Sequence, residues 1–122
     1  VVVLDGNILE KPANIAEAVD LLGRLSGRRH TVISSLALLG DPAGNEYLTH
    51  EKTSVEFLPL SADAIRKYVA TGEPMDKAGA YGIQGYGALM VRGIEGCYFN
   101  VMGLPLARLG GLLRQVFPKK CE

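Results

Sequence analysis

The sequence has 122 residues, 48% of them hydrophobic and 21% charged, which fits one globular domain over residues 1–122 and argues against disorder. Its 13 basic and 13 acidic side chains cancel, so no overall positive field favours nucleic acid or an anionic membrane as a partner. The apolar runs are too short to span a bilayer, and two cysteines without a CxxC spacing indicate neither a disulfide scaffold nor a zinc ribbon, so we expect a cytoplasmic protein.

The first part of the sequence predicts a short hairpin and then an amphipathic helix. A β-branched run at residues 1–4 meets the turn signal Asp5-Gly6, and residues 7–9 are expected to return as a second strand. Apolar residues then recur at helical spacing over residues 15–25. Asn14 directly precedes them and is a good N-cap, so we expect this helix to begin there.

The middle of the sequence predicts a long hairpin followed by a second helix. Residues 29–39 have a strand-like pattern, and residues 47–57 alternate strictly between the two sides of a strand. Residues 40–45, between them, have the composition of a loop. Ser61 is a suitable N-cap for a helix over residues 62–71, which has one apolar face.

The last part predicts a short strand at residues 88–91, a turn within residues 93–96 and a helix that starts near Pro105. Residues 118–122 read as a polar tail. This order of strands and helices favours an α/β or α+β fold in which helices flank a mixed β-sheet.

The glycine-rich segment at residues 73–87 is the strongest candidate for a binding site. Its closely spaced glycines are Gly79, Gly82, Gly85 and Gly87. Glycines let a backbone approach a ligand closely, and free amides in such a loop bind anions. Lys77 can supply a positive charge for phosphate, Asp76 can bind a divalent metal or orient that lysine, and Gln84 can read the edge of a base. An ordinary loop with a surface Asp–Lys pair is the alternative, and composition does not decide between the two.

Few other residues carry a chemical signal. Lys11 follows the first hairpin, and it gains weight as a site residue only if it lies near Lys77; otherwise it is a solvated surface charge. His30 and His50 stand in strand-like segments and are interpreted as structural or surface residues. Neither cysteine is expected to be a nucleophile, because no spacing suggests a Cys–His pair.

Five stretches of the sequence, in order, match the motifs of a known family. They are residues 1–12 (VVVLDGNILEKP), 25–32 (LSGRRHTV), 53–60 (TSVEFLPL), 73–85 (EPMDKAGAYGIQG) and 94–106 (IEGCYFNVMGLPL). On these stretches the chain resembles the Maf family of nucleoside triphosphate pyrophosphatases, relatives of the inosine triphosphatase-like α/β fold. The resemblance implies hydrolysis between the α and β phosphates, which yields a nucleoside monophosphate and pyrophosphate, with a divalent cation such as Mg or Mn.

The resemblance also implies roles for individual residues. Lys11 and Lys77 would act in catalysis by contacting phosphate or holding acidic site residues, and Asp76 would organise the site or the metal, although the metal ligands stay unknown. Gln84 matches the glutamine linked with the choice of base, and the form of residues 80–85 looks like the subfamily that acts on dTTP and UTP. The glycines expected to lie against the substrate are Gly79, Gly82 and Gly85.

Two motifs of the family have no counterpart in this sequence. They are a Ser-Pro-Arg-Arg loop that grips phosphates and an Ala-Asp-Thr triplet that carries the general base, which in the family precedes the strand matched by residues 1–4. We therefore expect the carboxyl-terminal portion of a Maf-like domain, with little activity by itself and with apolar faces that favour a homodimer. The alternative function is an inactive Maf-like domain that binds nucleotides or serves as an interaction module.

Overall fold

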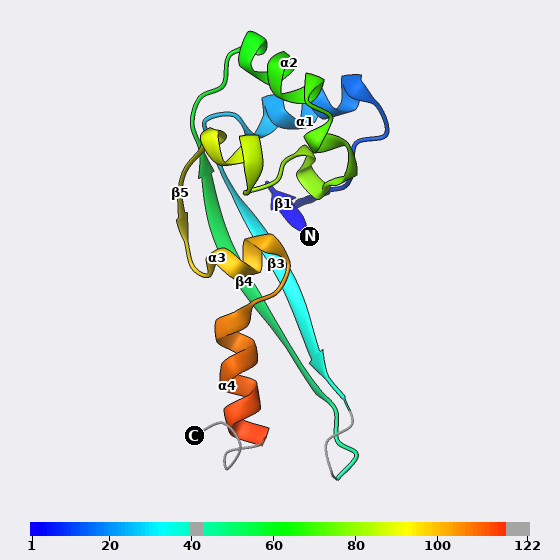
Figure 1. Cartoon of the computed structure of the whole chain (residues 1–122), viewed down its shortest axis with the longest axis vertical. Helices are drawn as coiled ribbons and strands as arrows, with labels where there is room; N and C mark the ends of the chain where they lie inside the picture. The colour runs from blue at the N-terminus through cyan, green and yellow to red at the C-terminus, as the bar shows by residue number, and fades with distance from the viewer. Residues whose placement is uncertain (40–42, 117–122) are drawn as a thin grey trace.

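The computed structural model describes residues 1–39 and 43–116, and their framework is one five-stranded sheet in the order β2-β1-β3-β4-β5 (Figure 1). The strands are β1 (Val2–Leu4), β2 (Asn7–Leu9), β3 (Arg29–Leu38), β4 (Tyr47–Phe57) and β5 (Val91–Glu95). The α/β prediction is confirmed. The sheet was expected to be mixed, but each pairing in the described residues is antiparallel, because a tight turn reverses β1 into β2 and β3 then runs against β1.

In the part of the chain that the structure describes, four α-helices and three short 3-10 helices accompany this sheet. They are α1 (Ile15–Leu25), α2 (Ala62–Ala70), η1 (Glu73–Asp76), η2 (Ala78–Ala80), η3 (Gly85–Met90), α3 (Tyr98–Met102) and α4 (Leu106–Val116). Figure 1 shows α1 and α2 together at one end of the molecule, α3 across β3 and β4, and α4 at the other end. Within the described ranges, no helix is long and apolar enough to cross a bilayer.

The helices α1 and α2 begin directly after the predicted N-cap residues, Asn14 and Ser61. The Asn14 side chain accepts a hydrogen bond from the backbone N–H of Glu17 at 2.9 Å, and the Ser61 hydroxyl accepts one from that of Ala64 at 3.0 Å. Each cap satisfies a backbone donor that has no partner inside its helix and contributes about 1 kcal/mol to stability. Both predicted N-caps are confirmed.

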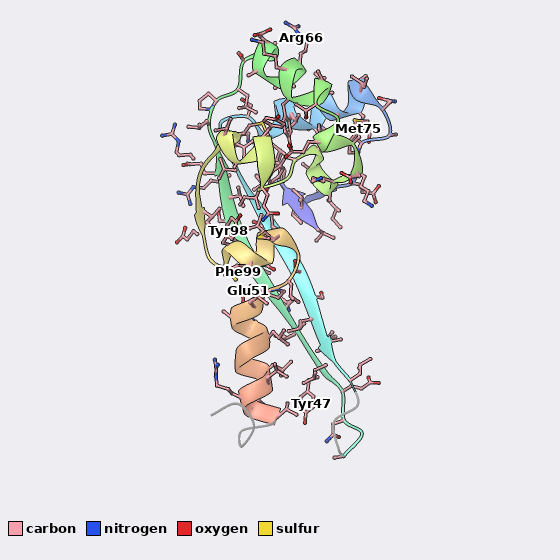
Figure 2. The ribbon with its side chains drawn as sticks, viewed as in Figure 1. Tyr47, Glu51, Arg66, Met75, Tyr98 and Phe99 are labelled. Atoms are coloured by element: carbon pink, nitrogen blue, oxygen red, sulfur yellow. The ribbon has the colours of Figure 1, made fainter. Side chains whose placement is uncertain are left out.

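The hydrophobic core occupies only one end of the hairpin formed by β3 and β4. Leu22 and Leu25 of α1 and Val55 and Phe57 of β4 are almost fully buried there. In the other half of the hairpin, β3 and β4 have no buried residue, and Tyr47 lies near the described end (Figure 2). The long hairpin was predicted, and residues 40–42 of its loop lie outside the described residues, as does the predicted tail at 118–122.

The region after the glycine-rich segment differs from the prediction. Residues 85–90 form η3 rather than a strand, and the strand β5 comes afterwards, with the turn at Gly96, where φ is +123°. The apolar residues at positions 88–91 suggested a strand, but the backbone N–H of Leu58 bonds the Met90 carbonyl at 2.9 Å and fixes the point at which β5 begins. Tertiary contact therefore overrides the local preference.

The short helix α3 was not predicted, because five residues are too few to show helical periodicity. It is anchored by Asn100, a fully buried side chain whose Nδ2 lies 3.1 Å from the carbonyl oxygens of Val32 and Glu51 and 3.0 Å from Thr53 Oγ1. Three contacts to β3 and β4 thus hold α3 on the sheet. The predicted last helix is confirmed as α4, which begins one residue after Pro105 and is tied to Glu51 by Arg108 at 2.8 Å.

His30 is part of the core, as its structural interpretation predicts. Its Nε2 lies 2.6 Å from the Tyr81 hydroxyl, and its ring packs edge-on against Phe57 and Tyr81. Burial lowers the pKa of His30 to about 4, because the charged imidazolium would lose its hydration there. His50, by contrast, is exposed on the far half of β4.

Acidification is expected to destabilise the fold through His30. The unfolded chain takes up this proton near pH 6.5 but the folded chain only near pH 4, so the free energy of unfolding falls as the pH drops through this window. The expected loss is about 2.5 kcal/mol between about pH 7.5 and about pH 4.5. Urea unfolding at both pH values measures it, and His30→Gln should remove this part of the pH dependence. The same pH dependence in both proteins would contradict the assignment.

Candidate functional site

The glycine-rich segment folds back against the start of the chain. The backbone N–H of Gly79 donates to the Glu10 carbonyl at 3.1 Å, and a Cβ on Gly79, where φ is +72°, would lie 3.1 Å from the Val2 side chain. Only glycine allows this close approach in this backbone conformation without displacing its neighbour. The contact places η1 and η2 beside β1 and β2, so residues far apart in the sequence share one region.

A cavity of about 300 Å³ lies between this segment and the sheet. Residues of β1, β3 and α3 form part of its lining, and Lys77, Gly82 and Gln84 complete it from the glycine-rich segment. Three of the predicted site residues therefore meet at one cavity. Such a cavity, with a cation and a side-chain amide among largely apolar residues, has the character of a small-molecule site.

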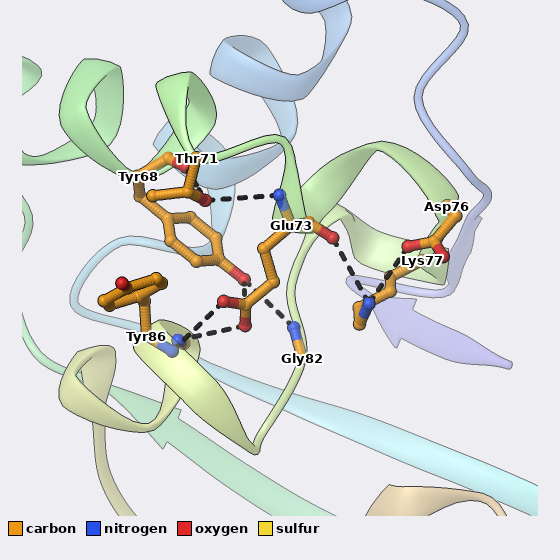
Figure 3. A network of polar contacts seen from close by, with 8 residues as sticks. Tyr68, Thr71, Glu73, Asp76, Lys77, Gly82 and Tyr86 are labelled. Atoms are coloured by element: carbon orange, nitrogen blue, oxygen red, sulfur yellow. Dashed lines mark hydrogen bonds and ion pairs between the residues drawn. The ribbon is translucent and has the colours of Figure 1, made fainter.

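The Lys77 ammonium is held in place by two oxygens. Its Nζ lies 3.0 Å from Asp76 Oδ1 and 3.3 Å from the backbone carbonyl oxygen of Glu73 (Figure 3). The hydrogen bond from Lys77 lowers the pKa of Asp76, and the positive charges of Lys77 and Lys11 lower it further. Lys11 is exposed, but it lies close enough for its charge to act on Asp76. The three predicted charged residues thus form one electrostatic group, of which Lys77 lines the cavity.

Two predicted glycines do not line the cavity. They are Gly79, packed on Val2, and Gly85, at which φ is +65° and a Cβ would lie 3.0 Å from a carboxylate oxygen of Glu73. The structure thus gives both glycines a conformational and steric role, Gly79 against β1 and Gly85 against Glu73 within the segment. Gly82 does line the cavity, and it also lies under the side chain of Lys77, because a Cβ there would come within 2.7 Å of Lys77 Cε.

Two residues of the region, Tyr68 and Glu73, were given no role by sequence reasoning. Glu73 Oε1 accepts hydrogen bonds from the Tyr68 hydroxyl at 3.1 Å and from the backbone N–H of Gly87 at 3.2 Å, and Oε2 accepts one from that of Tyr86 at 3.1 Å (Figure 3). The only signal in the sequence was a carboxylate four residues before Lys77. Its partners are two backbone N–H groups and the hydroxyl of Tyr68, and no spacing in the sequence links them to Glu73.

The described residues offer few candidate ligands for a metal ion. Among residues 1–39 and 43–116, no group of three or more His, Cys, Asp or Glu side chains is arranged to bind an ion. Asp76 is an exposed carboxylate beside the cavity-lining Lys77, with its side chain 81% accessible. Mg²⁺ commonly takes one or two carboxylates together with phosphate oxygens and water, and Asp76 has the chemistry of such a carboxylate ligand.

Comparison with known proteins identifies the family. The family model described as "Maf-like protein" matches residues 1–116. The chain therefore belongs to the Maf family, as its motifs predict.

Several relatives carry a functional name. A "dTTP/UTP pyrophosphatase" of Moorella thermoacetica is 56% identical over 112 residues, which are 92% of this chain and 58% of that protein. Proteins of the same name from Symbiobacterium thermophilum and Clostridioides difficile are 55% and 50% identical, over 94% and 96% of this chain and 58% and 60% of their own length. The chain thus spans about three fifths of the length of these relatives.

The close approach of residues 82 and 87 gives a test of the segment's packing. A Cβ on Gly87 would lie 1.8 Å from the Gly82 carbonyl oxygen, so Gly87→Ala must displace the backbone and is expected to cost about 2 kcal/mol or more. The matched control is Gly93→Ala, because a Cβ there meets nothing within 4 Å and should change stability by less than about 1 kcal/mol. Urea unfolding measures both, and equal stability of the two variants would contradict this packing.

Proposed function

We propose that this chain takes part in the hydrolysis of dTTP and UTP to the nucleoside monophosphate and pyrophosphate. The observation that carries the proposal is the meeting of Lys77 and Gln84 at one cavity. A triphosphate requires positive charge near its oxygens, and a base requires a neutral group with a donor and an acceptor. Membership of the Maf family and the names of the relatives support the same reaction and the same two nucleotides.

In this proposal Lys77, Asp76 and Lys11 have different roles toward the phosphates. Lys77 neutralises charge on the phosphate oxygens, and the oxygens of Asp76 and Glu73 hold its ammonium in position. Asp76 has a lowered pKa and stays ionised, so it suits a holding role better than that of a base that takes a proton from water. Lys11 contributes a second positive charge beside Asp76.

Gln84 carries the choice of base in this proposal. Uracil and thymine present a carbonyl acceptor next to an N–H donor, and a carboxamide offers the complementary donor and acceptor. The carboxamide of Gln84 is neutral, so it distinguishes bases by their pattern of hydrogen-bond donors and acceptors rather than by charge. Gln84 is exposed at the rim of the cavity, where an incoming base reaches it.

A divalent cation, Mg or Mn, belongs to the proposal, with Asp76 as its protein ligand. When bound, it would supply further charge neutralisation on the phosphate oxygens. A cytoplasmic location and a homodimer stay predictions. An inactive module that binds nucleotides or another protein stays the alternative, and the measurement of pyrophosphate release described next distinguishes it from an enzyme.

Lys77→Ala tests the proposal. Binding of dTTP is measured on the 122-residue chain by calorimetry, and pyrophosphate release with Mg²⁺ is measured on a chimera in which residues 1–116 replace the matching segment of the Moorella relative. Loss of the ammonium should lower turnover of dTTP and UTP by about 100-fold or more, because the transition state gathers charge on the phosphates.

The matched control for this substitution is Lys67→Ala. Lys67 is an exposed lysine of α2 whose ion pair with Asp63 is a surface contact of little energetic weight. Turnover by this control should stay within about twofold of the unaltered chimera. Binding of dTTP by the 122-residue chain, with no pyrophosphate release by the unaltered chimera, would favour the alternative function. Equal turnover in Lys77→Ala and Lys67→Ala would remove Lys77 from the mechanism.

A further inference from the structure

We propose that Glu73 and Tyr68 are positioning residues that set the base selectivity of the site by holding the loop from which Gln84 projects. We call the Glu73 carboxylate and the Tyr68 hydroxyl, with the backbone amides of Gly82, Tyr86 and Gly87 that they bind, the loop clamp. The inference rests on the proposed function, because it concerns how the same cavity recognises a pyrimidine.

The Glu73 carboxylate holds the part of the loop that follows Gln84. Glu73 Oε2 accepts from the N–H of Tyr86 at 3.1 Å, and Oε1 accepts from the N–H of Gly87 at 3.2 Å. Hydrogen bonds to an ionised acceptor are about twice as strong as neutral ones. The two amides follow Gln84 directly, with only Gly85 between, so the carboxylate fixes the chain just past the base-reading side chain.

The Tyr68 hydroxyl holds the part of the loop that precedes Gln84. The Tyr68 hydroxyl donates to Glu73 Oε1 at 3.1 Å and accepts from the N–H of Gly82 at 3.1 Å. Tyr68 is buried on the core face of α2, so its ring is a rigid support. Figure 3 shows the hydroxyl and the carboxylate side by side, with the amides of Gly82 and Tyr86 directed at them. Gln84 thus lies between two fixed points of the backbone.

Gln84 itself has no such support. Its side chain is exposed, and no hydrogen bond to it is found among the described residues. An amide that selects a base must lie at a defined place, and a displacement of about 1 Å is enough to lose much of such a contact. The backbone conformation around Gln84 is therefore the element that sets where its amide can reach, and the clamp sets that conformation.

Glu73 also contacts Lys77, the residue that the proposed function places at the phosphates. The backbone carbonyl of Glu73 accepts from Lys77 Nζ at 3.3 Å, while its carboxylate holds the loop of Gln84. The phosphate contact depends on the backbone of Glu73, and the base contact depends on its side chain. A substitution of the side chain should therefore separate the two halves of recognition.

Glu73→Gln and Tyr68→Phe make this separation measurable. Both keep the size of the side chain while weakening or removing the hydrogen bonds of the clamp. The matched controls are Glu95→Gln, at an exposed carboxylate of β5, and Tyr98→Phe, at a tyrosine of α3 outside the cavity lining. Calorimetry on the 122-residue chain gives the dissociation constants of dTTP, dCTP and inorganic tripolyphosphate with Mg²⁺.

In the clamp variants, the preference for dTTP over dCTP should fall by about fivefold or more, whereas tripolyphosphate affinity should stay within about twofold. Amide hydrogen exchange at residues 86 and 87 should become faster in Glu73→Gln. The controls should change neither quantity. Adding Gln84→Ala to Glu73→Gln should lower the preference no further than Gln84→Ala does by itself, because both act through the same side chain.

The outcomes separate this inference from the proposed function. An unaltered chain that binds dTTP no more tightly than tripolyphosphate would contradict the proposed function. It would also contradict the role of Glu73 and Tyr68 in base selectivity. An unaltered chain that prefers dTTP, with the same preference in both clamp variants, would overturn the clamp alone. Equal losses for dTTP, dCTP and tripolyphosphate would show that the clamp only maintains the fold of the site, and this would also overturn its role in selection.

Discussion

Two oxygens hold the Lys77 ammonium at the wall of the cavity, and the rest of the site is arranged around that contact. One is the Asp76 carboxylate at 3.0 Å and the other is the backbone carbonyl of Glu73 at 3.3 Å. A lysine side chain has many rotamers, and fixing one of them costs conformational entropy. The two oxygens offset that cost, so the positive charge is already fixed at the cavity wall.

The hydrogen bonds of the segment that carries Lys77 are largely local, and glycine is what makes them possible. At Gly87 the backbone passes so close to Gly82 that a Cβ would meet a carbonyl oxygen at 1.8 Å. Glycine-rich composition suggested contact with a ligand, yet the structure gives Gly79 and Gly85 roles inside the protein. Gly82 differs from these two glycines, because it lines the cavity and also packs against the side chain of Lys77.

The sequence predicts those features that depend on local chemistry. Asn14 and Ser61 are N-caps because their side chains reach amides three residues away, and the long hairpin follows from strict alternation in β4. The approach of Lys77 and Gln84 to one cavity was expected from their motif, and the geometry agrees with it.

Features that depend on contacts between distant segments were not predictable in this way. The start of β5 is set by a bond between Leu58 and Met90, and α3 is held by the buried amide of Asn100. The role of Glu73 was hidden for the same reason, since its partners are backbone N–H groups and a tyrosine hydroxyl from another helix. The motifs pointed to three residues that line the cavity, namely Lys77, Gly82 and Gln84, and only the structure shows which other residues line it and which hold Lys77 in place.

The most direct test of the central claim is the map of amide chemical-shift changes when the ¹⁵N-labelled chain is titrated with dTTP and Mg²⁺. If Lys77 and Gln84 recognise the two ends of one nucleotide, the largest changes should fall on residues 77–84 and on the residues of β1, β3 and α3 that line the cavity. Changes that concentrate on the groove between β4 and α4, or none at saturating nucleotide, would contradict the claim.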